Sequence, residues 1–202
     1  SPPRIDDYLN SMEQDALGEI GNISFGSSAT ALSTLLNQKV DITTPAVSIV
    51  ERNKLKEEFP HPYVAIQVNY TKGFSGVNLL VIKQSDAAII ADLMLGGDAI
   101  SPSELLGEIQ LSAVREAMNQ MMGASSTSLS QMFEMKIDIS PPTASLVDLN
   151  DVVSGGDMDL FLKDQFVKVS FRMEIGSLID SELIQMYPID FAKSLYRKFI
   201  ND

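Results

Sequence analysis

The chain has 202 residues, 45% of them hydrophobic, and a formal net charge of −12. This length suits one medium-sized domain or two small halves that share a core, and the ordinary apolar content argues against a disordered chain. The acidic balance argues against nucleic acid and anionic membranes as partners, because both require a basic face. No apolar run is long enough for insertion into a membrane.

Composition also limits the chemistry of the chain. Cysteine is absent and His61 is the single histidine. Disulfides and thiolate chemistry are therefore excluded, which fits a cytoplasmic protein. His61 lies between two prolines in a predicted loop, and one histidine cannot build a His-rich metal site or several Ser–His pairs.

The first half predicts two helices separated by three strands. Residues 1–10 are expected to be a flexible lead-in, because two early prolines block a helix. Ser11 and Gln14 form a capping-box pattern at the start of a long helix that ends near Leu36. Strands are predicted at 39–50, 63–70 and 74–82, with a loop over 51–61 and a second helix over 85–95. Pro45 indicates that the first strand is kinked or lies at a sheet edge.

The second half predicts the same order of elements. Ser101 as cap and Pro102 at the first helical position predict a long helix that ends near Phe133. Strands are predicted at 136–147, 165–175 and 178–186, with an acidic loop over 148–163 and a last helix over 189–200.

The two halves are an internal duplication. Lys39–Val50 reads K-V-D-I-T-T-P-A-V-S-I-V and Lys136–Val147 reads K-I-D-I-S-P-P-T-A-S-L-V. About 14 of 36 aligned positions between 15–50 and 112–147 are identical without a gap. Three strands and two helices bury too little core alone. We therefore predict an α+β domain over 11–202, in which pseudo-two-fold repeats 11–98 and 101–202 share one mainly antiparallel six-stranded sheet covered by helices.

The long helix of each repeat carries the same polar stripe. Asp15–Gly26 reads D-A-L-G-E-I-G-N-I-S-F-G, and Ser112–Gly123 reads S-A-V-R-E-A-M-N-Q-M-M-G. The shared pattern [D/S]-x-x-x-E-x-x-N places its three polar residues on one helix face. The first stripe is Asp15, Glu19 and Asn22, and the second stripe is Ser112, Glu116 and Asn119.

A solvated helix face explains one such stripe, but it explains the second copy less well. Asparagine is a mediocre helix former, so folding alone does not require it twice. Ala16 matches Ala113, but other residues between the stripe positions have diverged, for example Gly18 against Arg115 and Gly21 against Met118. The duplication therefore favours a functional role, provided that both Glu–Asn pairs are exposed.

The chemistry of the pair narrows that role. Asparagine is neither a general base nor a nucleophile, but its two donors and one acceptor can orient a water molecule. A glutamine positions the attacking water in this way in GTP-hydrolysing switches. An ionised glutamate repels phosphate and pairs with a Lys, an Arg or a metal ion. Each stripe offers at most two carboxylates and no His, which argues against a metal enzyme. Such a stripe is half an active site, and a partner must supply the rest.

These motifs resemble the CheC/CheX/FliY family of bacterial chemotaxis phosphatases over nearly the whole chain. The resemblance is carried by E-I-G-N-I-S-F-G, E-A-M-N-Q-M-M-G and both K-[V/I]-D-I-[T/S]-x-P strands, and it is stronger to the flagellar-switch branch than to the CheC branch. It implies that Asn22 and Asn119 orient water at the aspartyl phosphate of phosphorylated CheY, while Glu19 and Glu116 pair with a lysine of that partner. Asp15 and Ser112 are supporting positions.

The resemblance also implies the surroundings of the protein. Mg²⁺ is expected in the partner's active site, with no cofactor bound by this chain. Further partners are expected among switch proteins of the FliM, FliN and FliG types, at the cytoplasmic face of the flagellar basal body. Two other functions fit the same residues: a non-catalytic CheY-binding scaffold of the switch complex, and a CheC-like adaptor that also binds the deamidase CheD.

Two further expectations concern the same helices. Met118, Met121 and Met122 are expected to fill the core instead of lining a groove for a partner. The glycines of the first helix, Gly18, Gly21 and Gly26, suggest the hypothesis that another protein approaches this helix closely.

Overall fold

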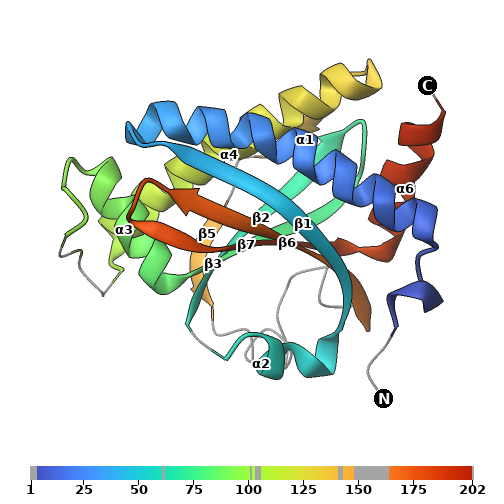
Figure 1. The fold of residues 1–202 in the computed structure, drawn as a ribbon, viewed down its shortest axis with the longest axis horizontal. Coiled ribbons are helices and arrows are strands. Elements are labelled where there is room, and N and C mark those ends of the chain that lie inside the picture. Colours follow the sequence, from blue (N-terminus) through green and yellow to red (C-terminus); the bar gives the residue numbers. More distant parts are fainter. Residues whose placement is uncertain are drawn as a thin grey trace.

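The computed structural model describes residues 4–60, 62–100, 102, 106–140, 143–147 and 164–201. A curled sheet carries two long helices, α1 (Ser11–Leu36) and α4 (Glu108–Phe133), over one face, and a short helix, α2 (Leu55–Glu58), lies beyond the other face (Figure 1). Two further helices, α3 (Gln84–Met94) and α6 (Ile189–Ile200), flank the two long ones. The predicted α+β class is confirmed.

The sheet has six strand positions, as predicted. Its order is β1-β6-β7-β3-β2-β4, and β5 also pairs with β2, so that β4 and β5 share one edge position. Every recorded pairing is antiparallel. The strands are β1 (Val40–Glu51), β2 (Tyr63–Lys72), β3 (Gly76–Lys83), β4 (Asp138–Ile139), β5 (Thr143–Val147), β6 (Gln165–Ile175) and β7 (Ile179–Pro188).

The repeats exchange their first strands. Strand β1 of the first repeat pairs along its length with β6 of the second, and β4 and β5 of the second repeat pair with β2 of the first. The two hairpins meet at the centre, where β3 pairs with β7. The order is therefore symmetric about the β3–β7 contact, as a pseudo-two-fold duplication requires.

The sheet separates two apolar cores. The larger core lies between the sheet and the helices α1, α3, α4 and α6. A smaller core lies on the other face under α2, where Leu55 and Phe59 are buried. In the larger core Phe25 of α1 packs on Phe171 of β6, with ring centroids 4.6 Å apart. The predicted place of the methionines is confirmed, since Met118, Met121 and Met122 are fully buried.

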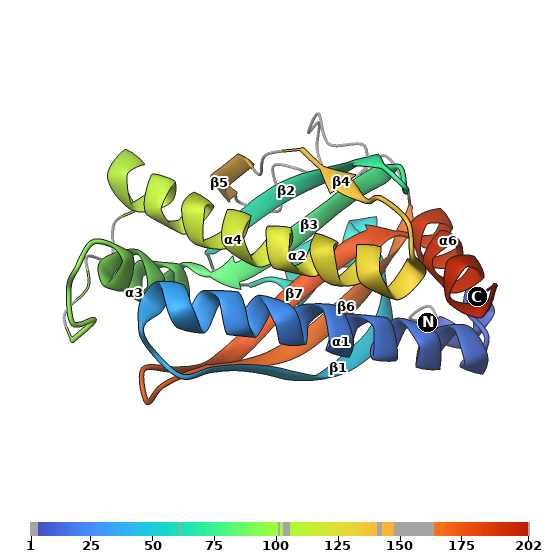
Figure 2. The ribbon, with the colours of Figure 1, turned by 90° about the horizontal axis from the view of Figure 1, so that it is seen from above.

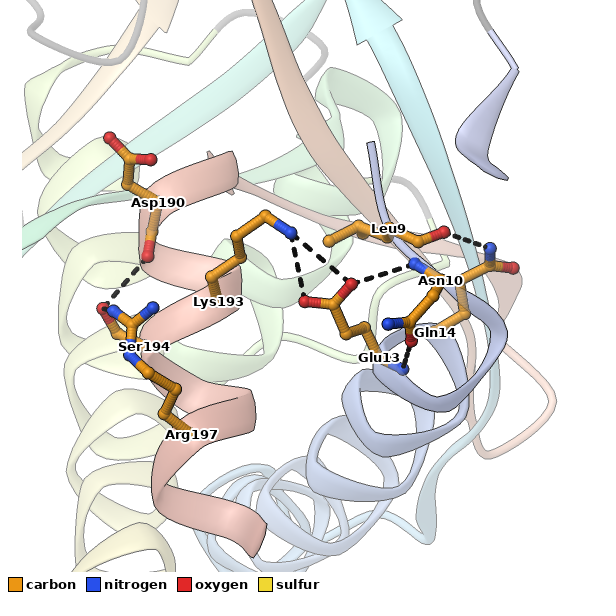
Figure 3. Close-up of polar contacts among 8 residues, drawn as sticks. All are labelled: Leu9, Asn10, Glu13, Gln14, Asp190, Lys193, Ser194 and Arg197. Atoms are coloured by element: carbon orange, nitrogen blue, oxygen red, sulfur yellow. Dashed lines mark hydrogen bonds and ion pairs between the residues drawn. The ribbon is translucent and has the colours of Figure 1, made fainter. Parts of the chain in front are cut away.

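Helix α1 begins with a capping box one residue earlier than the predicted one. Asn10 Oδ1 accepts from the backbone N–H of Glu13 at 2.8 Å, and the N–H of Asn10 donates to Glu13 Oε1 at 2.9 Å. Figure 3 shows that Lys193 of α6 also reaches Glu13. Within the lead-in, residues Ile5–Asp7 form the 3₁₀ turn η1 and Leu9 is only 1% exposed.

The predicted start of the second long helix at Pro102 is wrong. Helix α4 begins at Glu108 after an extended Gly107, whose N–H donates to Gln110 Oε1 at 3.1 Å. Leu106, two residues before the first residue of α4, is already buried in the larger core. The helix therefore starts only after this contact has been made. Ser101, His61 and the acidic stretch 148–163 lie outside the described residues.

Two other local expectations have clear outcomes. Strand β1 lies at a sheet edge, and its pairing with β6 is irregular between Thr43 and Ala46, around Pro45. The proline predicted a kink or an edge position, and the edge position is confirmed. The predicted loop over 51–61 instead contains the 3₁₀ turn η2 (Arg52–Lys54) and α2.

Candidate functional site: two polar stripes on paired helices

Helices α1 and α4 lie side by side and run in opposite directions (Figure 2). Their backbones approach closely because small residues occupy the contact. The hydroxyl of Ser28 in α1 donates to the carbonyl oxygen of Met121 in α4 at 2.7 Å, and Ser24 and Ser125 are also buried here. Most apolar residues of both helices face the sheet, which leaves the opposite faces of the pair to solvent.

Both stripes lie on these solvent-facing sides. Asp15, Glu19 and Asn22 are exposed on α1, and all three members of the second stripe are exposed on α4. A functional role of the stripes requires both Glu–Asn pairs to be exposed, and both are. Their roles in catalysis are not decided by exposure and stay a prediction.

The stripes make few polar contacts inside the molecule. Glu116 Oε1 accepts a hydrogen bond from Gln120 Nε2 at 3.0 Å. Within the described part of the chain, the structure records no side-chain hydrogen bond or ion pair for Asn22, Asn119 or Glu19. Their donors and acceptors are thus available to water or to a partner.

Gln120 is a residue that the sequence analysis missed. It lies next to Asn119 and one turn beyond Glu116, the spacing at which helix side chains meet. Its counterpart in the first stripe is Ile23, which cannot form that hydrogen bond. Glu116 therefore has a hydrogen-bond partner on its own helix, whereas no such partner is recorded for Glu19. The two stripes differ in this contact.

Asn119 opens onto a hollow between the two helices. The hollow has a volume of about 490 Å³. Gly123 and Ala124 of α4 and Ser27 and Ala31 of α1 line it beside Asn119. These short side chains leave space next to the carboxamide, where a partner's loop or water molecules can enter.

The glycines near the stripes fall into two groups. A Cβ at Gly18, Gly26 or Gly123 would meet nothing within 4 Å, whereas a Cβ at Gly21 would lie 3.0 Å from Phe171 Cζ. Gly21 is therefore explained by the packing of α1 on the sheet. The other three are not explained by contacts among the described residues.

The structure offers no metal cage of its own among the residues that it describes. No three side chains of the His, Cys, Asp or Glu type come together there as possible ligands. The expectation that Mg²⁺ is held by the partner stays a prediction.

Comparison with known proteins defines the class. The CheC-like family model matches residues 12–49 and 109–146, which are the equivalent stretches of the two repeats. The crystal structure of Thermotoga maritima FliY superposes with a TM-score of 0.85 at 40% identity, covering 95% of this chain and 97% of that one. The chain belongs to the CheC-like family.

Two curated relatives place it more finely. The flagellar motor switch phosphatase FliY of Bacillus subtilis is 60% identical over 199 residues, which are 98% of this chain and 52% of that protein. The chain thus spans about half the length of this relative. The CheY-P phosphatase CheC of Bacillus subtilis is 28% identical over 153 residues, 73% of each chain. The recognition of the family from its motifs is confirmed.

Proposed function

We propose that this chain is a protein phosphatase that hydrolyses the aspartyl phosphate of a CheY-type response regulator at the flagellar motor switch. The observation that carries the proposal is the pair of exposed Glu–Asn stripes on adjacent helices. Support also comes from the relatives, because one is named a flagellar motor switch phosphatase and another a CheY-P phosphatase.

Asn22 and Asn119 are the proposed catalytic residues. In each site the carboxamide oxygen accepts a hydrogen bond from a water molecule, and the amide group donates to a phosphoryl oxygen. The water oxygen then bonds to phosphorus in line with the bond to the aspartyl carboxylate, and that bond breaks. The products are free carboxylate and inorganic phosphate, and the proton of the water leaves with phosphate or solvent. Fixing this geometry lowers the entropic part of the barrier.

Glu19 and Glu116 are the proposed docking residues. An ionised carboxylate one turn from the asparagine repels phosphate but attracts a lysine beside it in the partner. Gln120 orients Glu116 for this contact. Mg²⁺ bound by the partner's carboxylates would neutralise charge on the phosphoryl oxygens. Asp15 and Ser112, at the first position of each stripe, are proposed supporting residues.

The proposal includes a location. By similarity to FliY, the protein acts at the cytoplasmic face of the flagellar basal body, in contact with switch proteins of the FliM, FliN and FliG types. Among the described residues, no helix combines the length and apolar character that a membrane span requires.

Phosphate release from phosphorylated CheY with Mg²⁺ tests the proposal. We expect Asn22→Ala and Asn119→Ala each to remove the contribution of one site. The double variant should lose about 10²-fold or more in rate, because orienting a water supplies a few kcal/mol. Asn53→Ala is the matched control, since this asparagine is exposed in η2, outside α1 and α4. Wild-type turnover in the double variant would sink the proposal.

The same assay separates the alternatives. A scaffold binds phosphorylated CheY through the same stripes without accelerating phosphate release. A CheC-like adaptor retains CheD in a pull-down with purified proteins. Binding without acceleration contradicts catalytic stripes, whereas retention of CheD tests the adaptor function independently of the stripes.

A further inference from the structure

Each polar stripe continues into an exposed apolar residue. Met12 lies three residues before Asp15, and Ile109 lies three residues before Ser112, at the same offset that relates the two stripes. Met12 is 65% exposed and Ile109 is 68% exposed. Residues three apart on a helix share a face, so each apolar side chain extends the line of its stripe.

Folding does not account for these two side chains. Each is the second residue of its helix, and both remain mostly in solvent. One exposed apolar residue on a surface needs no explanation. Two at equivalent positions are less expected, because most residues next to the stripes differ between the repeats, although Ala16 and Ala113 are identical. A use outside the molecule explains why both repeats have a large apolar side chain here.

The surface is continuous from the apolar residue to the stripe. At α4, Ile109 and Ser112 line one hollow of about 510 Å³ together with Met94, the last residue of α3, and Leu95, which follows it. The apolar side chain and the first polar position of the second stripe therefore face the same space. A partner that covers one of them must also cover the other.

We propose that Met12 and Ile109 are apolar anchors for the same phosphorylated response regulator, one at each site. This inference rests on the proposed function. At 1.5 Å per residue, each anchor lies about 10 Å along the helix from the glutamate and about 15 Å from the asparagine. The partner must then present, beside its phosphorylated aspartate, first a cation and then an apolar patch at these spacings. The anchor strengthens binding of the phosphorylated regulator, and the asparagine accelerates hydrolysis of its phosphate.

The test separates binding from chemistry in the same assay. The variant Met12→Gln with Ile109→Gln removes the apolar surface at both sites without weakening either helix, because glutamine equals methionine and exceeds isoleucine in helix propensity. We expect KM for phosphorylated regulator to rise about tenfold, with kcat changed less than about twofold. Asn22→Ala with Asn119→Ala should do the reverse. Leu35→Gln is the control, because Leu35 is 37% exposed at the other end of α1 and lies off the stripe.

A conservative variant and a binding assay complete the design. Met12→Leu with Ile109→Leu should restore KM, whereas an unchanged KM in the double Gln variant overturns the inference while leaving the phosphatase proposal intact. If wild type releases no phosphate, the phosphatase proposal fails instead. The anchors are then judged by the Kd for regulator complexed with beryllofluoride, which mimics the aspartyl phosphate. A Kd about tenfold weaker in the double Gln variant supports them, and an equal Kd or no binding by wild type overturns them.

Discussion

Glycine occupies the position one turn beyond each asparagine of the stripes, where the fold itself leaves room for a side chain. Gly26 follows Asn22 and Gly123 follows Asn119 by four residues, and a Cβ at either would meet no atom within 4 Å. A helix-interior glycine costs about 1 kcal/mol relative to alanine. In both repeats the long helix is therefore less stable than it would be with alanine next to the proposed catalytic amide. A glycine at this position fits close approach of a partner's backbone.

Replacing both glycines with alanine should separate stability from activity. We expect Gly26→Ala with Gly123→Ala to raise the free energy of unfolding by about 1 kcal/mol per site in urea titrations. The same variant should lower the rate of phosphate release, because the added methyl groups stand between the helix and the partner. Gly21→Ala is the contrasting change, since its methyl must displace the buried ring of Phe171. Increased stability with unchanged activity would show that the glycines serve no partner.

At the scale of elements, α1 is tied to α6 by one partly buried ion pair. Lys193 Nζ lies 3.1 Å from Glu13 Oε2, and the Glu13 side chain is only 10% exposed (Figure 3). Burial raises the pKa of Glu13, but the hydrogen bond from the Asn10 N–H and the ammonium of Lys193 together outweigh it and hold the pKa below its usual value. The carboxylate that caps α1 therefore also fixes the position of α6.

This contact should make stability depend on pH. A carboxyl group with a lowered pKa in the folded state stabilises the protein above its unfolded-state pKa of about 4.3, and the contribution disappears as pH falls through the folded-state pKa. Glu13→Gln keeps the capping box but removes the charge. We expect it to cost about 1 kcal/mol at pH 7 and progressively less below about pH 4.

Urea titrations across this pH range check the expectation. Asp180→Asn is the control, because the ion pair of Asp180 with Arg172 is exposed on the sheet and should contribute little. A Glu13→Gln deficit that stays constant from pH 7 to pH 3 would rule out the charge as its cause.

Most elements could be predicted because their signals are local. Alternation in 63–70 and 165–175 gave β2 and β6, and Pro45 gave the edge position of β1. The start of α4 was missed because Pro102 is a good first helical residue on local grounds, whereas the burial of Leu106 is a tertiary effect. The ends of α1 at Leu36 and of α4 at Phe133 were predicted, but the left-handed conformation of Asn37 and Glu134, which follows each end, was not. Glutamate gives no sequence signal for that conformation.

The candidate site was predictable for a different reason. Duplication acts as an internal comparison, because the matched Glu19 and Glu116 stand out against diverged neighbours. The hydrogen bond of Gln120 and the anchors Met12 and Ile109 required coordinates, since exposure and contacts decide their meaning. The offset that relates Met12 to Ile109 was visible in the sequence, but exposed and buried apolar residues look alike there.

At the scale of the whole molecule, the exchange of first strands makes each repeat depend on the other. Strand β1 has its only recorded neighbour, among the described strands, in β6 of the second repeat, and β5 has its recorded neighbour in β2 of the first. Helix α1 packs along α4, and the Ser28–Met121 hydrogen bond joins the repeats at the helix contact. Neither half can bury its own helix and sheet faces alone.

Separated repeats should therefore be unfolded singly and folded together. We expect residues 1–98 and 99–202, produced as two polypeptides, each to lack a cooperative urea transition, because the β1–β6 and β2–β5 pairings are absent. Mixed at equal concentration, they should recover the circular dichroism of the intact chain, since all of these contacts lie between the two polypeptides. Phosphate release should return with the fold. Each half carries one complete stripe, on a long helix that is expected to fold only when the halves combine. Cooperative unfolding of either half by itself would show that a repeat holds a sufficient core, contrary to the exchanged topology.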